Sequence, residues 1–503
     1  MRRALSIAIV LVLGSPLALA ALPPAPSPAA LAEPIAVVAL IDSGINPYHV
    51  AFRDPSPLAE QHPCTYIPGY PCSAIALDLS LDAPDFATAR AADHDLWENL
   101  LGGQLYWIPG TKIIGAISLG AGGVRCPLVD IPPANAVNRP GGIVASTLGL
   151  PPCPDDLPIL DEHGHGTMTA SRAAGNDHSL CPSCRIVEIE GLGAEGVRWA
   201  ADQGWIDVQS NSWLNLVPPP VENLGDDPAN PMSVGLSFEY AAQRMPTLAA
   251  SGNGAGYIMG FAPTPTYALS TAAPGVLLVG GHDNGHVTAW AGAPAHVAAD
   301  AFGGWAAAND DLTRWEPDPI SCCTSAAAPY AAGGAAAVIL EARRIFADVS
   351  GPGIHGGVVA RASSGDTPVR GPLSDGVFTL EELTRVYRHT AQPRPVEGRD
   401  DGLLHFMAGA AEGEPLPVDL LVAHGLGTNP FCQGCWTLPV PWALVPADLP
   451  QFPLIGYGAV NEHSVALASA VFQGVAPEPA RAIDDQLYAL DQQLRADVFF
   501  AHD

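Results

Sequence analysis

The feature that most constrains this 503-residue chain is a set of three short segments that carry an aspartate, a histidine and a serine. They lie far apart in the sequence, at Asp42–Gly44, His165–Thr167 and Thr324–Pro329, and small residues surround each of them. A carboxylate, an imidazole and a hydroxyl together make an activated nucleophile. Unrelated folds that share this chemistry place the three residues in different orders, so the order Asp, His, Ser restricts the fold.

The first segment follows an apolar run, Ala36–Ile41, which is typical of a strand buried on both faces of a sheet. We therefore expect Asp42 at the carboxyl end of that strand, where open α/β sheets bind their ligands. Gly44 allows a sharp turn out of the strand. A carboxylate there can accept a hydrogen bond from a histidine Nδ1–H and stabilise the imidazolium. Taken alone, the segment is better explained as a strand that ends in an Asx turn.

The second and third segments also allow purely structural interpretations. Within Asp161–Ser171 two histidines, His163 and His165, compete for the role of base, and a His-x-His pair can also bind a metal. Ser325 precedes an Ala- and Gly-rich stretch, Ala326–Arg344, that predicts a helix. Its hydroxyl would then lie at a helix N-terminus, where free N–H groups and the helix dipole favour an oxyanion. A serine that only caps a buried helix is the alternative.

Taken together, the three segments resemble the subtilisin-like serine proteases, the subtilase family. The family pattern has a histidine followed by Gly-Thr, two further residues and then alanine, which His165 and Ala170 match and His163 does not. The resemblance implies Asp42, His165 and Ser325 as the catalytic triad, and it leaves the other histidine in a nearby loop.

Two further segments extend the resemblance. Leu248–Gly254 resembles the subtilase segment whose asparagine completes the oxyanion hole, which implies Asn253 as a donor; a Gly-Asn-Gly turn is the structural alternative. Asp207–Trp213 resembles the strand edge that pairs with an extended substrate. Cys323 and the residue after Trp213 stand where the family usually has glycine. The substrate-binding residues implied in this way are Ser212, Trp213, Leu214, Ser251 and Gly252.

The resemblance implies an α/β fold, the three-layer subtilisin-like fold, with a mostly parallel central sheet and loop-rich insertions. It implies a secreted serine endopeptidase that hydrolyses protein or peptide substrates through an acyl-enzyme and needs no cofactor for the chemistry. A catalytically silent subtilase-like scaffold that binds peptides or protein partners is the main alternative. An esterase of the α/β-hydrolase type is disfavoured, because no Gly-x-Ser-x-Gly elbow surrounds Ser325.

The N-terminus has the three-part layout of a secretory signal peptide over residues 1–20. Arg2 and Arg3 precede an apolar core, and Ala18-Leu19-Ala20 precedes the expected cleavage site. A Pro/Ala-rich linker follows over 21–34. No later stretch is long and apolar enough to span a bilayer, so we expect a secreted or cell-envelope protein that is free of the membrane after cleavage.

The net charge of −29 comes from 51 acidic and 22 basic residues, and it argues against nucleic-acid binding, which needs basic patches. The same acidity is compatible with a structural calcium ion, which subtilases often hold. No EF-hand-like spacing defines such a site, so the metal ligands stay unknown. We expect the chain to be a monomer.

The ten cysteines follow an export signal, and an oxidising destination favours disulfides. Sequence proximity predicts four local pairs. Two of the pairs have Cys-x-x-Cys spacing, so a single four-thiolate zinc site or a pair of redox motifs is the alternative for them. The predicted pairs are Cys64–Cys72, Cys126–Cys153, Cys181–Cys184 and Cys432–Cys435.

The catalytic domain is expected over 35–470, with insertions at about 53–155 and 393–453 and a helical tail over 471–503. Thr379 and Glu382 form a capping box, and the helix that it starts has an apolar face. Gly456–Asn461 resembles the segment that closes the subtilase domain. An acidic amphipathic helix is expected over Ile483–Val498. The apolar face of the helix that begins at the Thr379 capping box consists of Leu380, Leu383, Val386 and Tyr387.

Overall fold

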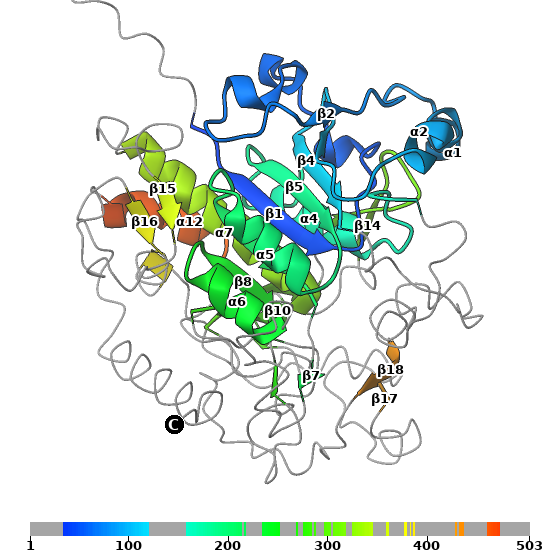
Figure 1. The fold of residues 1–503 in the computed structure, drawn as a ribbon. Helices are drawn as coiled ribbons and strands as arrows, with labels where there is room; N and C mark the ends of the chain where they lie inside the picture. The colour runs from blue at the N-terminus through cyan, green and yellow to red at the C-terminus, as the bar shows by residue number, and fades with distance from the viewer. Residues whose placement is uncertain are drawn as a thin grey trace, which may run out of the picture. The chain divides into compact units, whose positions relative to one another are not determined.

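A ten-stranded sheet forms the centre of the fold in the computed structural model (Figure 1). The described residues are 34–119, 157–213, 216–217, 234–251, 268–269, 275–283, 286–287, 296–302, 305–317, 324–345, 359–361, 377–379, 383, 386–387, 428–429, 432–436 and 460–472. All of them belong to one unit, Pro34–Asp503.

The strands of this sheet follow the order β11-β10-β8-β6-β1-β5-β4-β3-β2, with β12 paired to β10. The seven strands from β12 through β10, β8, β6, β1 and β5 to β4 are parallel. Strand β11 is antiparallel to β10, and β3 is antiparallel to β4 but parallel to β2. Their bounds are β1 Val37–Asp42, β2 Ile75–Ala76, β3 Tyr106–Trp107, β4 Ile113–Ser118, β5 Arg185–Glu190, β6 Val208–Asn211, β8 Thr247–Ala250, β10 Leu277–Asp283, β11 His286–Val287 and β12 Val297–Phe302.

Helices cover both faces of the sheet, which gives three layers (Figure 1). Apolar side chains of α4, α7 and α12 pack on one face, and those of α5 and α6 pack on the other. The helices are α1 Phe86–Ala92, α2 His94–Glu98, α4 His165–Ala174, α5 Ala194–Asp202, α6 Val234–Ala242, α7 Thr324–Ile345 and α12 Glu462–Phe472. Short 3-10 turns lie at Val50–Phe52, Pro57–Glu60 and Pro63–Thr65. The α/β fold class and the mostly parallel sheet are confirmed.

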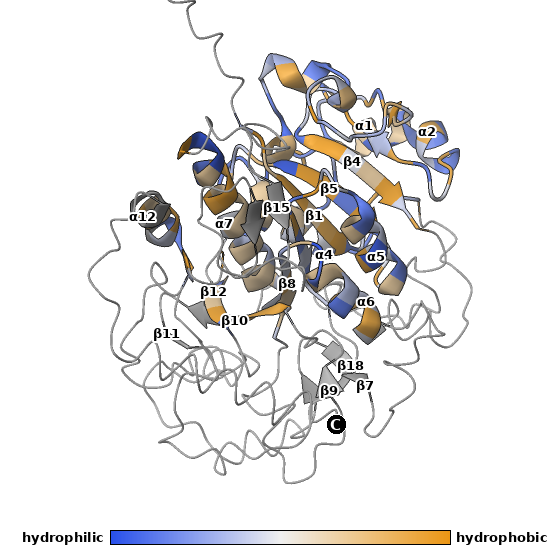
Figure 2. Cartoon of the chain, turned by 60° about the vertical axis from the view of Figure 1, so that its left-hand side comes forward, coloured by the Kyte–Doolittle hydropathy of each residue, from blue (hydrophilic) through white to orange (hydrophobic). Residues whose placement is uncertain are grey.

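Strand β1 shows why the sheet needs two layers of helices. Every residue of β1 is buried, and successive side chains alternate between the two cores, with Val38 and Leu40 on the α4 and α7 side and Val37 and Ala39 on the other. A continuous apolar run of this kind is typical of an interior strand of a parallel sheet with both faces covered. Figure 2 shows the hydrophobic colour along β1 and β4 and hydrophilic patches on α5 and α6.

The segment expected as an insertion over 53–155 extends the sheet in its described part, 53–119. Strands β4, β3 and β2 continue the sheet outward from β5, and helices α1 and α2 lie between β2 and β3 in the sequence. Strand β4 is almost entirely buried and pairs in parallel with β5. It is therefore a strand of the central sheet inside the range assigned to the insertion.

In the part of the chain that the structure describes, four two-stranded sheets accompany the central one. One of them pairs β13 with β14, which both precede α7 in the sequence, and Ala306 and Ala307 of β13 are buried. The pairs are β7 Leu216–Val217 with β9 Ala268–Leu269, β13 Trp305–Ala307 with β14 Trp315–Pro317, β15 Val359–Arg361 with β16 Val377–Thr379, and β17 Thr428–Asn429 with β18 Cys432–Trp436.

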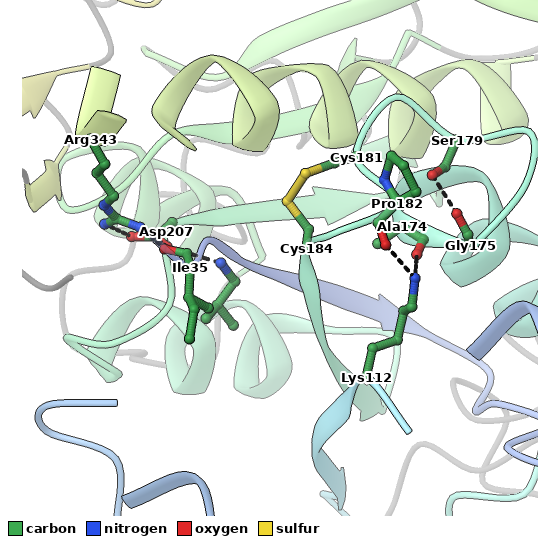
Figure 3. Close-up of a disulfide and its surroundings, with 11 residues drawn as sticks. Ile35, Lys112, Ala174, Gly175, Ser179, Cys181, Pro182, Cys184, Asp207 and Arg343 are labelled. Atoms are coloured by element: carbon green, nitrogen blue, oxygen red, sulfur yellow. Dashed lines mark hydrogen bonds and ion pairs between the residues drawn. A yellow bond between two sulfur atoms is a disulfide. The ribbon is translucent and has the colours of Figure 1, made fainter. Parts of the chain in front are cut away.

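A buried ion pair fixes the C-terminal half of α7 on the sheet (Figure 3). The Arg343 guanidinium donates from Nη1 to Asp207 Oδ2 at 2.9 Å and from Nη2 to Asp207 Oδ1 at 2.6 Å, and it also bonds the carbonyl of Ile35. Asp207 Oδ2 accepts a further bond from the Val37 N–H at 2.9 Å. These contacts join α7 to the start of β1 and to the residue before β6.

A second set of polar contacts holds the C-terminal end of α4 (Figure 3). Lys112 Nζ, just before β4, donates to the carbonyls of Ala174 at 2.8 Å and Pro182 at 2.6 Å. Burial lowers the pKa of Lys112 to about 7, and the nearby Arg185 charge acts in the same direction. Pro182 lies within the loop closed by the buried Cys181–Cys184 disulfide, which precedes β5.

Two of the predicted disulfides are present, Cys64–Cys72 and Cys181–Cys184. The Cys181–Cys184 disulfide argues against the four-thiolate zinc site, because its two sulfur atoms are bonded to each other and are not thiolates. Cys126 and Cys153 and the side chains of Cys432 and Cys435 lie outside the described residues, so their pairing stays a prediction.

The helix predicted after α7 is confirmed where it is described, since Leu383, Val386 and Tyr387 are helical and buried. Tyr387 donates to the carbonyl of Ala331 in α7 at 3.1 Å. Asn461, the last residue of the predicted closing segment, accepts from the N–H of the third helical residue of α12. The signal peptide, the linker and Ile483–Val498 lie outside the described residues.

Among the helices that the structure describes, none combines the length and the apolar character that a bilayer crossing requires.

Candidate active site

The aspartate of the first segment and the histidine of the second are in direct contact. Asp42 is the last residue of β1, and His165 is the first residue of α4. His165 Nδ1 lies 2.7 Å from Asp42 Oδ1. The same carboxylate accepts from the Ser43 N–H at 2.8 Å and from the Thr169 hydroxyl at 3.2 Å. A carboxylate only accepts, so Nδ1 carries the proton and Nε2 of the neutral ring is left as a base.

Two glycines allow this contact by letting the turn after β1 meet the first turn of α4. Gly44 has φ +112°, and a Cβ there would lie 2.5 Å from the Ile159 carbonyl oxygen. A Cβ on Gly166 would lie 2.0 Å from the Gly44 carbonyl oxygen. A side chain at Gly44 would push the turn after β1 away from Ile159 and Asp161, and one at Gly166 would push α4 away from that turn. Both glycines therefore allow the close approach of Asp42 and His165.

The electrostatics of the pair favour a charged imidazole. Burial lowers the pKa of His165, but the Asp42 charge and hydrogen bond raise it, and the charge of Asp161 adds to them. The net result is a pKa above the ordinary 6.5, although 21% of the side chain stays exposed. A reaction that needs neutral His165 would therefore lose rate as pH falls through this raised pKa.

The serine of the third segment lies at the start of the long helix α7, where Ser325 is the second residue. Its hydroxyl donates to the Ser212 carbonyl at 2.9 Å, so it must turn to use His165 as a base. Met168 of α4, Ala306 of β13 and Ala326 form one buried cluster, which brings the first turns of α4 and α7 together.

Further along, the two helices cross at backbone contact. A Cβ on Gly333 of α7 would lie 2.1 Å from the Ala173 carbonyl oxygen of α4. The absence of a side chain at Gly333 therefore sets the distance between α7 and α4. The helices that carry His165 and Ser325 in their first turns are therefore packed directly on each other.

The substrate-binding residues of the sequence analysis are only partly described. Ser212 and Trp213 follow β6, Ser251 follows β8, and all three are buried. Strand β6 pairs with β1 on one side and β8 on the other, so Val208–Asn211 offers no free edge to a substrate. The prediction of a strand edge that pairs with substrate is thus wrong for β6 itself. For the residues that follow β6 it stays a prediction. Leu214, Gly252, Asn253 and Cys323 lie outside the described residues.

Some residues of the site were not anticipated from the sequence. Thr169 and Ser43 bond the Asp42 carboxylate, and Asp161 bonds the segment that carries His165. An Asp three residues before the helix-starting glycine is a capping signal that could have identified Asp161. The other two are ordinary small polar residues, and only the tertiary contacts reveal them.

A buried carboxyl group, Glu188, lies in the core near Asp42. It stands on β5 opposite Leu40 of β1 and Ala116 of β4 and is fully buried. Burial raises its pKa well above the ordinary 4.5, and the charges of Asp42 and Asp161 raise it further, while the Gly44 backbone N–H opposes them. Glu188 is therefore protonated in the folded chain at pH values where the unfolded chain has lost this proton.

Glu188→Gln should make stability less sensitive to rising pH. Above pH 4.5 the unfolded wild-type chain releases the proton while the folded chain keeps it, so rising pH favours unfolding. Each pH unit between the unfolded and folded pKa values corresponds to about 1.4 kcal/mol. Urea unfolding at several pH values should show the variant gaining stability relative to wild type above pH 4.5 and matching it below.

The exposed Glu60 gives the matched control, and Glu60→Gln should follow the wild-type pH dependence. A constant difference between Glu188→Gln and wild type across the pH range would mean that the buried carboxyl does not stay protonated on folding.

Among the described residues, one group of side chains could share a metal ion, the exposed His94, Asp95 and Glu98 of α2. Exposed acidic groups of this kind are common without an ion, so they do not bear on the calcium prediction, which stays open.

No family model and no curated protein matches this chain. Solved structures that resemble it include the protease domain of PatA, with 14% identity, 73% of this chain and 90% of that chain covered and a TM-score of 0.37. A cold-adapted subtilisin-like serine proteinase has 14% identity, 73% and 85% coverage and a TM-score of 0.35. The epidermin leader peptide processing serine protease of Staphylococcus aureus has 12% identity, 62% and 66% coverage and a TM-score of 0.38. All three are described as proteases, and one of them as a subtilisin-like serine proteinase.

Proposed function

We propose that this chain is a serine endopeptidase that cleaves peptide bonds through an Asp42–His165–Ser325 triad and an acyl-enzyme. The observation that carries the proposal is the 2.7 Å contact between His165 Nδ1 and Asp42 Oδ1 at the carboxyl end of a parallel strand, with the Ser325 helix packed on the His165 helix. Ligands bind at this end of open α/β sheets. An aspartate that orients a histidine beside a serine is the arrangement that activates a hydroxyl.

The proposed chemistry assigns one task to each side chain. His165 Nε2 takes the proton of the Ser325 hydroxyl as Oγ attacks the peptide carbonyl carbon, and Asp42 stabilises the imidazolium that forms. The imidazolium then gives its proton to the leaving amine. His165 then takes a proton from water, whose oxygen attacks the acyl carbon, and it returns that proton to Ser325 Oγ as the acyl–oxygen bond breaks.

The tetrahedral oxyanion needs donors that are already in place. The backbone N–H of Ser325 lies in the first turn of α7, where the helix leaves N–H groups without intrahelical acceptors. The Asn253 side chain is the second proposed donor, by resemblance. Substrate is proposed to bind as an extended peptide along Ser212–Leu214 and Ser251–Gly252.

Export is proposed from the signal-like residues 1–20, and the Cys64–Cys72 and Cys181–Cys184 disulfides agree with an oxidising destination. The mature enzyme is proposed to act as a monomer outside the cytoplasm, without a cofactor in the chemistry and with calcium as a candidate structural ion.

Reaction with a fluorophosphonate probe tests the proposed function, because such probes trap activated serine hydroxyls. The folded chain should be labelled on the single peptide that contains Ser325, and heat-denatured chain should not be labelled. Labelling should weaken as pH falls through the raised pKa of His165, since protonated His165 cannot take the hydroxyl proton. A folded chain that resists the probe would instead favour a silent scaffold that binds peptides.

A further inference from the structure

One buried carboxylate outside the triad contacts both segments that form the Asp42–His165 pair. Asp161 is 2% exposed and lies in the segment before α4. Its Oδ1 accepts from the N–H groups of His163 at 3.0 Å and Gly164 at 2.7 Å and from the Ser43 hydroxyl at 3.0 Å. Its Oδ2 accepts from the Thr167 N–H at 2.7 Å. Four donors thus converge on one side chain.

These bonds replace the cap that α4 lacks. The residue before the helix is Gly164, with φ +90°, which has no side chain to accept from the first free N–H groups. Asp161 accepts from the N–H groups of Gly164 and Thr167, which lie on either side of His165 in the sequence. A negative charge at a helix N-terminus is also favourable. Asp161 therefore fixes the backbone that carries His165.

The Ser43 hydroxyl extends the same network to β1. It donates to Asp161 Oδ1 and accepts from the Gly166 N–H at 3.0 Å. The Ser43 N–H meanwhile donates to Asp42 Oδ1, the oxygen that faces His165 Nδ1. The carboxylate of Asp161 thus connects the turn that holds Asp42 to the turn that holds His165.

Asp161 interacts electrostatically with acidic and basic groups on three elements. The acidic groups are Asp42 of β1 and Glu188 and Glu190 of β5, and His165 of α4 is a basic group. Burial raises the pKa of Asp161, the bonds from Thr167 and Gly164 lower it, and the charge of Asp42 raises it. When Asp161 is ionised, its charge favours protonated His165.

We propose that Asp161 is a positioning residue, which holds His165 against Asp42 and adds negative charge beside the imidazole. The proposal rests on the proposed peptidase function for its kinetic readout. It assigns Asp161 no contact with substrate.

Asp161→Asn tests the proposal with a side chain of the same shape. Its oxygen can still accept at Oδ1, but its NH₂ group would face the Thr167 N–H, so two donors would meet. The charge beside His165 would also be lost. We expect kcat to fall about ten- to a hundredfold with KM within twofold, as for a displaced catalytic group. The acid limb of kcat/KM should move to lower pH, because the pKa of His165 falls.

Two further variants separate positioning from charge and from general capping. Ser43→Ala breaks the link to β1 but keeps the charge, so kcat should fall while the acid limb stays in place. Asp85 caps α1 by accepting from the Thr88 N–H at 2.8 Å, and Asp85→Asn should leave kcat, KM and the pH profile unchanged.

The titration of His165, followed by NMR of labelled histidine and assigned with His165→Ala, is a readout independent of activity. A lower pKa of His165 in Asp161→Asn would support the proposal even if the wild-type chain proved inactive, in which case only the proposed function fails. Unchanged kcat in an active enzyme, or an unchanged His165 pKa, would overturn the role of Asp161.

Discussion

Replacing Ser325 by alanine should lower kcat for peptide hydrolysis by about a millionfold, the scale measured when the nucleophile of subtilisin is removed. The variant has no hydroxyl to attack the carbonyl carbon, and the oxyanion donors and substrate contacts alone leave only a small residual rate. Initial rates with a peptide substrate, together with fluorophosphonate labelling, measure the loss. Labelling should disappear from the peptide that contains position 325.

The fold should survive this change. The Ser325 hydroxyl donates only to the Ser212 carbonyl at 2.9 Å, so its removal should cost about 1 kcal/mol of stability. Alanine is also a good helix former in α7. Ser179→Ala, which removes a hydroxyl that donates to the Gly175 carbonyl at 2.6 Å, is the control and should keep full activity. Undiminished hydrolysis by Ser325→Ala would exclude Ser325 as the nucleophile.

The elements that hold the triad could be predicted because their signals are local. The apolar run before Asp42 is typical of an interior strand, and the structure has β1 there with both faces covered. The Ala- and Gly-rich stretch after Ser325 predicted a helix, and the structure has α7 there, in backbone contact with α4 at Gly333. In both cases the residue composition of one short segment indicates that the segment is buried and whether it forms a strand or a helix.

What the sequence did not predict depends on contacts between distant segments. Strands β2 and β3 have two residues each, too few for a periodic pattern, so the range that holds them looked loop-rich. The interior position of β6 follows from its pairing with β1 and β8, which no local pattern reveals.

Asp161 is the clearest case of a site residue that sequence reasoning missed. Its partner Ser43 lies 118 positions away in the chain. An aspartate before a helix reads as an ordinary cap, and only the fold connects it to Asp42 through that serine. The choice of His165 over His163, in contrast, could be made from the local sequence motif. The contact between His165 and Asp42 now makes that choice testable.

His165→Ala should be as damaging to kcat as Ser325→Ala, whereas His163→Ala should keep substantial activity. His165 bonds Asp42 through Nδ1, so its loss removes the base and leaves the Asp42 carboxylate without its partner. His163 lies in the same segment, with its ring centroid 6.1 Å from that of His165, and its backbone N–H bonds Asp161. That backbone bond survives substitution by alanine.

The two variants form a matched pair, since each removes one imidazole from the same segment. Rates with a peptide substrate across the pH range give the ranking. The acid limb should remain in His163→Ala, because it reports the raised pKa of His165, and the trace activity of His165→Ala should lack it. If His163→Ala were the inactive variant, His163 would be the base and the 2.7 Å contact between His165 and Asp42 would be structural. That result would also remove the reason for Asp161 to hold His165 in place, so this ranking should be measured before the Asp161 variants.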